Sequence, residues 1–549
     1  MKLLGEVLKE NNMITEQQLG IALKEQKGTG ELMGDVFVRL GIITRKDLAW
    51  AMARCSDLDY VDLRQTFIEP EAIKAVPSSL AKKYTLIPFA LDGEKIRVAM
   101  DNPNNVVALD TLRQSTRKNI EVFASDYEGI MEAIEIYYAV GTTIEEEIDK
   151  NVKAALAGAV AEGETAPPVV RLVDLFLIKA IRDGATDIHI TPEERITRVN
   201  FRVDGILRSE TIFPRDIHIP IVTRIKVMST LNIAESRLPQ EGGLVYEFSG
   251  REIDVRTSTS PTDNGENIVM RVLDKANVIL GLRHLGLNEN GQKTVRRMAG
   301  KPHGIVLSAG PTGSGKTTTL YSMLKEINAM EKNILTIEDP IEYHLPLIKQ
   351  TQVNEQSGLT FKEAIRHFLR QDPDIILVGE IRDLETAKIA FQAAMTGHLV
   401  FSTIHTNDAA STIARLLDLG VEPYLIPTCM RAVLAQRLIR KICPDCVEAY
   451  TPTDEEIENY GLQNWAGAGK TLKRGRGCPR CSNMGYRGRT GIFEIMEVTP
   501  AISNLITQRA SADVLVEAAR EEGMLTLRDD ALRWALEGVT TLDEVFRIT

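Results

Sequence analysis

The first sixty residues carry an internal repeat of apolar positions. Residues 3–23 align without gaps over residues 32–52, with a period of 29 residues. The matching pairs are Leu3/Leu32, Gly5/Gly34, Val7/Val36, Ile14/Ile43, Thr15/Thr44, Leu19/Leu48 and Ala22/Ala51. Each copy predicts a short helix, a turn and a second helix that begins near Thr15 or Thr44, where a threonine is a favourable N-cap. We therefore expect two packed helical hairpins over 1–60.

A small α/β unit is expected over 61–140. Residues 95–100 and 119–124 have the alternation of strands, and residues 104–116 and 126–138 have helical periodicity. The following stretch, 141–169, is rich in Ala, Gly and Glu and contains two consecutive prolines, which is typical of a linker.

The remaining chain divides into two larger domains. Residues 170–275 predict an α+β domain, with a long helix followed by several strands. Over 284–549 strands and helices alternate, which is typical of a doubly wound parallel sheet. The sequence therefore predicts a multidomain α/β protein, with a flexible join near 274–283.

Composition narrows the class of protein. The chain of 549 residues has 44% hydrophobic and 26% charged residues, as in ordinary globular proteins, and a net charge of −11. This charge disfavours a nucleic-acid track, which needs a basic groove. No apolar run is long enough to span a bilayer, and Glu6, Lys9 and Glu10 interrupt the apolar start, so no signal peptide is expected. We expect a cytoplasmic protein that partners bring to the inner membrane.

A phosphate-binding loop is the strongest chemical motif. The apolar strand 304–309 runs into G-x-x-x-x-G-K-T and then into a helical stretch, as this motif requires. Backbone N–H groups of such a loop surround the phosphates, with help from the helix N-terminus. Lys316 is expected to reach the β- and γ-phosphates and Thr317 to bind Mg²⁺. The predicted ATP-binding residues are Gly310, Pro311, Thr312, Gly313, Ser314, Gly315, Lys316, Thr317 and Thr318.

Polar residues follow three other predicted strands of the same domain. Glu380 ends the apolar strand 374–379, where a carboxylate can hold Mg²⁺ through water. Glu338, Asp339 and Glu342 lie within five residues after strand 334–337 and are candidates to orient or deprotonate the attacking water. His405 ends strand 398–404 at the edge where open α/β sheets bind ligands, so we expect it to sense the γ-phosphate.

Four of the six cysteines form two C-x-x-C pairs. Cys443 and Cys446 are separated by 31 residues from Cys478 and Cys481. Four thiolates satisfy tetrahedral Zn²⁺ and leave no open position, so a structural zinc site is predicted within a subdomain over 443–491. A disulfide is the weaker alternative in a reducing compartment.

The order of these motifs resembles the secretion-ATPase superfamily of type II and type IV secretion. The segments GPTGSGKT, TIEDPIE, DIILVGEIRD and TGHLVFSTIHTN are similar to its Walker A, aspartate box, atypical Walker B and histidine box. Further similar segments are ATDIHI (185–190), RVDG (202–205), RLPQEGG (237–243), IDVRTSTSP (253–261) and GYRGRTGIFEIM (485–496). The resemblance extends over nearly the whole chain.

The resemblance implies a homohexameric ring built on a RecA-like domain with a zinc-binding insertion, after a PAS-like α+β domain. It also implies that Glu342, rather than Glu338, is the catalytic glutamate, and that Glu380 supports Mg²⁺ and water. Arg224 and Arg237 of the preceding domain match the positions that supply charge to the phosphates. A solvated basic face paired with nearby acids is the alternative for these arginines.

Three functions remain after these observations. The first is the extension motor of a type IV pilus, which acts on an inner-membrane platform protein. The second is the type II secretion ATPase that drives a pseudopilus, and the third is a RecA-like nucleic-acid translocase, which the acidic charge opposes. The long N-terminal region favours the pilus.

The N-terminal repeat also resembles a module that binds cyclic di-GMP in some relatives. That module uses a basic residue before Leu-Gly and a Gly before the second helix. This chain has Leu3 and Leu32 at the first position, and Asn12 where the second repeat has Gly41. Docking on the membrane platform is therefore favoured over binding of the dinucleotide.

Overall fold

The computed structural model describes residues 3–11, 13–56, 58–63, 66, 68–93, 95–103, 105–138, 144–157, 167–248, 251–274, 281–327, 329–460, 462 and 471–549. The chain divides into two compact units, Met1–Val278 and Ile279–Thr549. No helix among the described residues has the length and apolar character needed to cross a membrane. The mixed α/β, multidomain class expected from the sequence is confirmed, whereas the predicted join near 274–283 lies largely outside the described residues.

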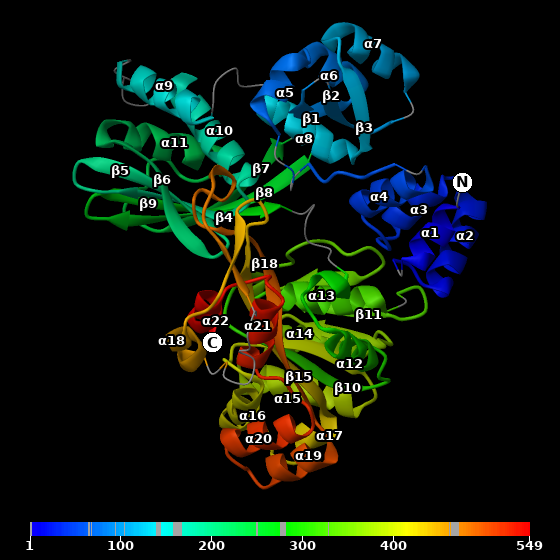
Figure 1. Ribbon diagram of the computed structural model, residues 1–549. Helices are drawn as coiled ribbons and strands as arrows, with labels where there is room; N and C mark the ends of the chain where they lie inside the picture. The colour runs from blue at the N-terminus through cyan, green and yellow to red at the C-terminus, as the bar shows by residue number, and fades with distance from the viewer. Residues whose placement is uncertain are drawn as a thin grey trace. The chain divides into compact units, whose positions relative to one another are not determined.

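The N-terminal repeat folds as a bundle of four helices (Figure 1). They are α1 (Leu4–Glu10), α2 (Glu16–Thr29), α3 (Met33–Arg39) and α4 (Arg45–Cys55). The Thr15 and Thr44 side chains accept hydrogen bonds from the backbone N–H groups of Gln18 and Asp47, which confirms both predicted N-caps. The repeats share one core, in which α1 packs on α4 and α2 on α3.

The glycines of the repeat are needed for this packing. A Cβ atom at Gly5 would lie 3.0 Å from a Leu19 methyl group, and one at Gly34 would lie 2.7 Å from the equivalent methyl group of Leu48. The matched Gly/Leu pairs seen in the sequence are therefore two copies of the same close contact.

The next part is a three-stranded sheet with helices, as expected for a small α/β unit. Its strands lie in the order β1 (Leu86–Asp92), β2 (Lys95–Met100), β3 (Asn119–Ala124), with β1 antiparallel and β3 parallel to β2. The helices are α5 (Pro70–Ala75), α6 (Ser78–Tyr84), α7 (Val106–Thr116) and α8 (Tyr127–Tyr138). The two predicted strands and two predicted helices are confirmed to within a few residues at their ends.

The predicted linker contains a helix, α9 (Ile144–Ala157). Its residues Ile148, Val152 and Ala155 pack into the core of the following domain and contact α10 (Pro167–Arg182). Residues 139–143 and 158–166 of this stretch lie outside the described residues. An Ala- and Glu-rich composition is compatible with a helix once a neighbouring apolar surface is available, and here α10 offers that surface.

The domain that follows is an antiparallel sheet with helix α11 (His218–Met228). The strand order is β6-β5-β4-β9-β8-β7, and every neighbouring pair is antiparallel. The strands are β4 (Ala185–Pro192), β5 (Ile196–Val203), β6 (Ile206–Pro214), β7 (Gln240–Phe248), β8 (Arg251–Thr262) and β9 (Gly265–Asp274). This is the α+β domain expected over 170–275.

The second unit contains a seven-stranded sheet in the order β12-β11-β13-β14-β10-β15-β18. All neighbouring pairs are parallel except β15 with β18. The strands are β10 (Gly304–Ala309), β11 (Ile334–Glu338), β12 (Lys349–Gln352), β13 (Ile375–Val378), β14 (Leu399–Ile404), β15 (Met430–Ile442) and β18 (Tyr486–Glu497). Every residue of β10, β11, β13 and β14 is buried, as in a parallel sheet with both faces covered.

Helices follow most of these strands, which gives the alternation expected from the sequence. They are α12 (Glu289–Ala299), α13 (Lys316–Glu326), α14 (Phe361–Phe368), α15 (Leu384–Met395), α16 (Ala409–Asp418) and α17 (Leu425–Cys429). After β15 come β16 (Val447–Tyr450), α18 (Asp454–Asn459), β17 (Leu472–Gly475) and, beyond β18, α19 (Pro500–Thr507), α20 (Ala512–Glu521), α21 (Leu527–Leu536) and α22 (Leu542–Ile548). The paired strands β16 and β17 lie between the two C-x-x-C segments.

Candidate active site and metal centre

The glycine-rich loop connects β10 to α13, as the motif requires. Gly313 and Gly315 have φ values of 77° and 91°, in the region that favours glycine, and Gly315 is the N-cap of α13. The Lys316 Nζ donates to the carbonyl oxygens of Gly310 (2.8 Å) and Pro311 (3.0 Å). The Ser314 Oγ is buried and has no hydrogen-bond partner among the described residues. The lysine, this hydroxyl and the helix N-terminus fit a bound phosphate chain.

Glu380 and His405 follow the two strands that lie next in the sheet on one side of β10. Glu380 follows β13 and His405 follows β14, and β14 lies between β13 and β10. The His405 Nε2 is 3.4 Å from a Glu380 carboxylate oxygen. Burial lowers the pKa of Lys316, whereas the charge of Glu380 raises it, which places this carboxylate close to the lysine. Burial and then Lys316 lower the pKa of His405 and outweigh Glu380, which raises it, so the neutral imidazole is favoured over the charged form.

Arg382 is a charged residue of this cluster that the sequence reasoning missed. Its guanidinium forms an ion pair with Glu380, and Glu380 in turn raises the pKa of Arg382. The Glu380 side chain is 14% exposed and the Arg382 side chain is 63% exposed. Its position two residues after Glu380 was the only signal in the sequence, because an arginine in a loop is usually a solvated charge.

The two glutamates of the acidic turn after β11 have different surroundings. Glu338 is buried, with a carboxylate that accepts hydrogen bonds from the hydroxyls of Tyr321 and Thr336. The Gln350 Nε2 also donates to it, over 3.1 Å. A buried carboxylate that accepts hydrogen bonds from three donors suits a structural role. Glu338 is therefore poorly placed to act as a base, which leaves Glu342 as the predicted catalytic glutamate.

Glu342 is half-buried. Burial and then Glu338 raise the pKa of Tyr321 in α13, and the charge of Glu342 adds to this rise, which places Glu342 near the phosphate-binding helix. Burial raises the pKa of the neighbouring Tyr343, and a hydrogen bond with the Thr318 side chain acts in the opposite direction. Thr318 is in the first turn of α13, and the ring of Tyr343 also packs edge-on against Tyr321 of the same helix. Tyr343 therefore attaches the acidic turn to the helix that begins at Lys316.

The two arginines expected to meet the phosphates lie in the first unit and differ in their surroundings. The Arg237 side chain is 90% exposed, on a loop that the Gln240 side chain closes by hydrogen bonds to Asn232 and Glu235. Arg224 is half-buried on α11. Burial raises the pKa of Asp174, and Arg224 lowers it, so this arginine lies near a carboxylate of α10. The Arg237 Nε also lies 3.9 Å from a Glu235 carboxylate oxygen, so this exposed arginine has an acidic neighbour as well.

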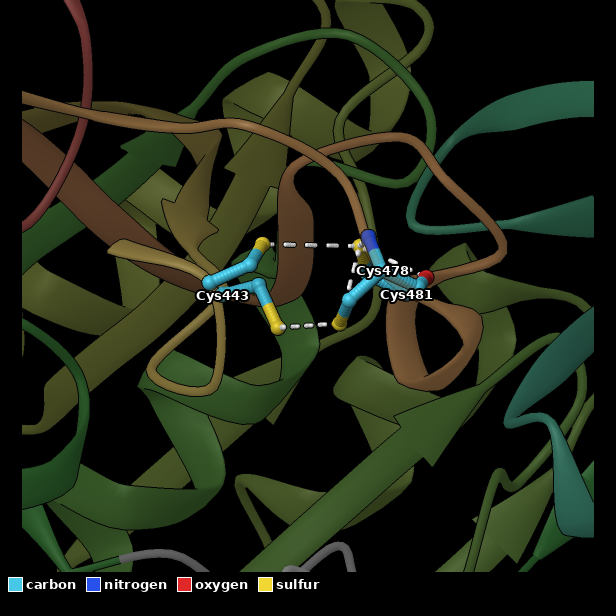
Figure 2. A group of neighbouring side chains, drawn as sticks. Cys443, Cys478 and Cys481 are labelled. Atoms are coloured by element: carbon cyan, nitrogen blue, oxygen red, sulfur yellow. Dashed lines mark hydrogen bonds between the residues drawn. The ribbon is translucent and has the colours of Figure 1, made fainter. Parts of the chain in front are cut away.

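The two C-x-x-C segments meet in space (Figure 2). The Sγ atoms are separated by 3.9 Å for Cys443 and Cys478, 3.9 Å for Cys446 and Cys481, and 3.7 Å for Cys478 and Cys481. Four sulfur ligands about 2.3 Å from a tetrahedral zinc ion lie about 3.8 Å apart, so the thiols fit this metal. Burial raises the pKa of Cys443 to about 12 and also raises that of Cys446, whereas N–H groups of Cys478 and Gly485 outweigh burial and lower the pKa of Cys481. A bound cation would be needed to hold all four groups as thiolates.

The side chains and backbone groups described above fit the ligands that the sequence predicts, which are ATP, Mg²⁺ and Zn²⁺. The loop and Lys316 would hold the ATP phosphates, Thr317 and Glu380 would hold Mg²⁺, and the four cysteines would hold Zn²⁺. None of these assignments involves His398, which precedes β14. Its Nδ1 lies within hydrogen-bond distance of the Ala393 carbonyl oxygen (2.9 Å) and the Thr396 hydroxyl (3.1 Å).

Comparison with known proteins places this site in a family. The family model of type II/IV secretion system proteins matches residues 162–547, and the model of the MshEN domain matches residues 56–144. The type IV pilus assembly ATPase PilB of Myxococcus xanthus is 41% identical over 562 aligned residues, which cover 99% of this chain and 98% of the relative. A type II secretion system protein E of Pseudomonas aeruginosa is 49% identical over 402 residues, covering 72% of this chain and 80% of the relative.

One further relative and one solved structure are also similar to this chain. The type II secretion system protein E of Xanthomonas campestris is 38% identical over 551 aligned residues, covering 99% of this chain and 96% of the relative. Among solved structures, the Legionella pneumophila ATPase DotB has a TM-score of 0.51 at 20% identity and covers 71% of this chain and 98% of its own. The latter likeness concerns the fold alone.

The two glutamates of the acidic turn are expected to respond differently to removal of their charge. Glu342→Gln should keep ATP binding and lower turnover by about 100-fold or more, because a positioned base contributes at least that much. Glu338→Gln should mainly lower the melting temperature, because one of its three donors loses its acceptor. Steady-state hydrolysis, nucleotide binding and thermal unfolding of the full chain measure both effects. Near-normal turnover in Glu342→Gln together with its loss in Glu338→Gln would reverse the assignment.

The cysteine cluster is expected to bind one zinc ion per chain. Cys443→Ser should abolish zinc binding and destabilise the 443–491 region, because a structural zinc contributes folding free energy directly. Cys55→Ser is the matched control, since Cys55 lies outside the cluster. Elemental analysis and limited proteolysis measure metal content and local stability. Protein that is purified under reducing conditions without metal, yet resists proteolysis at 443–491, would refute the zinc site.

Proposed function

The chain belongs to the family of type II/IV secretion system proteins, and we propose that it drives the extension of a type IV pilus. It is an ATPase of the group that powers pilus assembly and secretion. We propose further that a ring of six copies acts on an inner-membrane platform protein and promotes pilin polymerisation. Support comes from the relative from Myxococcus xanthus, which matches the chain from its N-terminal bundle to α22.

A type II secretion ATPase is the second candidate. The relative from Xanthomonas campestris also matches the whole chain, although at lower identity than the pilus relative. The relative from Pseudomonas aeruginosa has higher identity but covers less of the chain. We prefer the pilus because its relative combines the greater full-length identity with both the N-terminal region and the ATPase unit. A nucleic-acid translocase has no support from these relatives.

Hydrolysis at this site is assigned to the groups at the carboxyl edge of the sheet. Backbone N–H groups of the loop and Lys316 bind the β- and γ-phosphates, and the Thr317 hydroxyl and Glu380 hold Mg²⁺, which when bound neutralises phosphate charge. Glu342 accepts a proton from the water that attacks the γ-phosphorus, the bond from that phosphorus to the β,γ-bridging oxygen breaks, and ADP and inorganic phosphate result. The neutral His405, next to Glu380, donates a hydrogen bond to the γ-phosphate.

Further positive charge is needed because Lys316 and Mg²⁺ balance the charge of a triphosphate only in part, and Arg382 is already paired with Glu380. Among the two arginines expected from the resemblance, Arg237 is the better candidate, since its side chain is 90% exposed. An arginine supplied from outside a P-loop domain raises the rate of phosphoryl transfer by several powers of ten. We assign Arg237 to this role and Arg224, near Asp174, to a supporting one.

The N-terminal bundle is assigned to docking on the platform protein. Leu3 and Leu32, at matching positions of the repeat, are 70% and 76% exposed. Leucine offers apolar contact area and no charge to a phosphodiester. The MshEN model matches residues 56–144, downstream of these leucines. The match to this domain is compatible with binding of cyclic di-GMP, which stays the less favoured partner because the two leucines offer no charge.

Deletion of the gene in its own host separates the two candidate functions. We expect loss of surface pili with secretion of extracellular enzymes intact, and recovery of pili by the wild-type chain. The Lys316→Ala chain should be present at normal levels but fail to restore pili, because it lacks the cation that binds the phosphates. Electron microscopy and assays of secreted enzymes give the readouts. Loss of secretion with normal pili would favour the type II secretion ATPase instead.

A further inference from the structure

A buried glutamine on β15 forms hydrogen bonds with the phosphate-binding loop and with the strand that precedes the loop. Gln436 is 2% exposed and follows Ala435, the residue that pairs with Ala309 at the end of β10. Its Nε2 donates to the carbonyl oxygen of Ser314 over 2.8 Å. Its Oε1 accepts a hydrogen bond of 3.1 Å from the Ser308 hydroxyl. One side chain thus joins the last part of β10 to the residue before Gly315.

The chemistry of these partners fixes which way the carboxamide faces. The Ser314 carbonyl only accepts hydrogen bonds, so the NH₂ group of Gln436 has to face it. The Ser308 hydroxyl can then donate to the amide oxygen. A glutamine satisfies both partners, whereas a glutamate has no donor for the carbonyl and a methionine has neither group.

Two glycines of the loop also lie in close contact with Gln436. A Cβ atom at Gly310 would lie 2.6 Å from the Gln436 carbonyl oxygen, and one at Gly315 would lie 3.1 Å from its Nε2. Both glycines therefore lie in close contact with the same residue of β15, and Gly310 also lies close to the Ser314 Oγ. The contacts explain why the loop approaches this strand so closely at each end.

The hydrogen bond to Ser314 controls the direction of the next N–H group. In a planar trans peptide the carbonyl oxygen and the following N–H point in opposite directions. Because the Ser314 carbonyl faces Gln436, the Gly315 N–H faces away from β15. Backbone N–H groups of a P-loop are the donors that bind the phosphates.

We propose that Gln436 is a positioning residue for phosphate binding, which holds the Ser314–Gly315 peptide so that the Gly315 N–H points at the phosphate. The inference rests on the proposed binding of ATP by this loop. Gln436 does not touch the nucleotide itself. Its removal leaves every phosphate-binding residue in the chain but releases one peptide from its fixed orientation.

The test compares Gln436→Met and Gln436→Glu in the full chain. Met has a similar length without either hydrogen bond, and Glu keeps the shape but repels the Ser314 carbonyl. We expect the Kd for MgADP, measured by calorimetry, to rise about tenfold or more in both variants, from loss of a hydrogen bond to a charged group. Ser402→Ala is the matched control, because Ser402 is a buried polar residue of β14 whose Oγ has no partner among the described residues. Its Kd should equal that of the wild type.

The outcomes separate this inference from the proposed function. A purely structural role would lower the melting temperature and leave the Kd of the folded variants unchanged, which would overturn the proposal. Failure of both variants to fold would assign Gln436 to stability and overturn it as well. A wild-type chain that does not bind MgADP would remove the nucleotide site itself. Wild-type binding with a tenfold weaker Kd in a folded Gln436 variant supports the proposal.

Discussion

The parallel hydrogen bonding of β14 to β10 on one side and to β13 on the other determines where the candidate catalytic groups lie. The register pairs Ala309 with Ile404 and Val378 with Ser402, so the three strands end at nearly the same level. The loop that holds Lys316, the carboxylate of Glu380 and the imidazole of His405 therefore meet at one edge of the sheet. A shift of either pairing by two residues would move a side chain by about 7 Å and separate the lysine from its acidic neighbour.

Charge balance at this edge explains the contacts that the cluster makes. Glu380 is paired with Arg382 and lies near His405 and Lys316, so its negative charge is compensated by residues of the same unit. Lys316 meanwhile donates to two loop carbonyls. Binding of a triphosphate adds several negative charges that these groups balance only in part. On the proposed function, further cations from outside this unit would therefore accelerate hydrolysis.

Sequence patterns predicted the parts of this structure that depend on local signals. Thr15 and Thr44 were identified as N-caps because capping involves residues three positions apart, and the glycine-rich loop was placed because strand, loop and helix are contiguous. The cysteine cluster followed from ligand spacing. By contrast, the burial of Glu338 depends on Tyr321 and Gln350, which approach it only through the fold. Gln436 contacts Ser308 across 128 residues, and the composition of α9 gave no sign of the surface on which it packs.

The central claim is that the parallel-sheet unit binds ATP but needs cations from outside itself for rapid hydrolysis. Residues 279–549 form a compact unit of their own and contain the loop, Glu342, Glu380 and His405. The most direct measurement is the rate of ATP hydrolysis by this fragment at saturating MgATP, compared with that of the full chain. We expect the fragment to bind ATP and to hydrolyse it on the order of 10³-fold more slowly. Hydrolysis by a monomeric fragment at the rate of the full chain would contradict it.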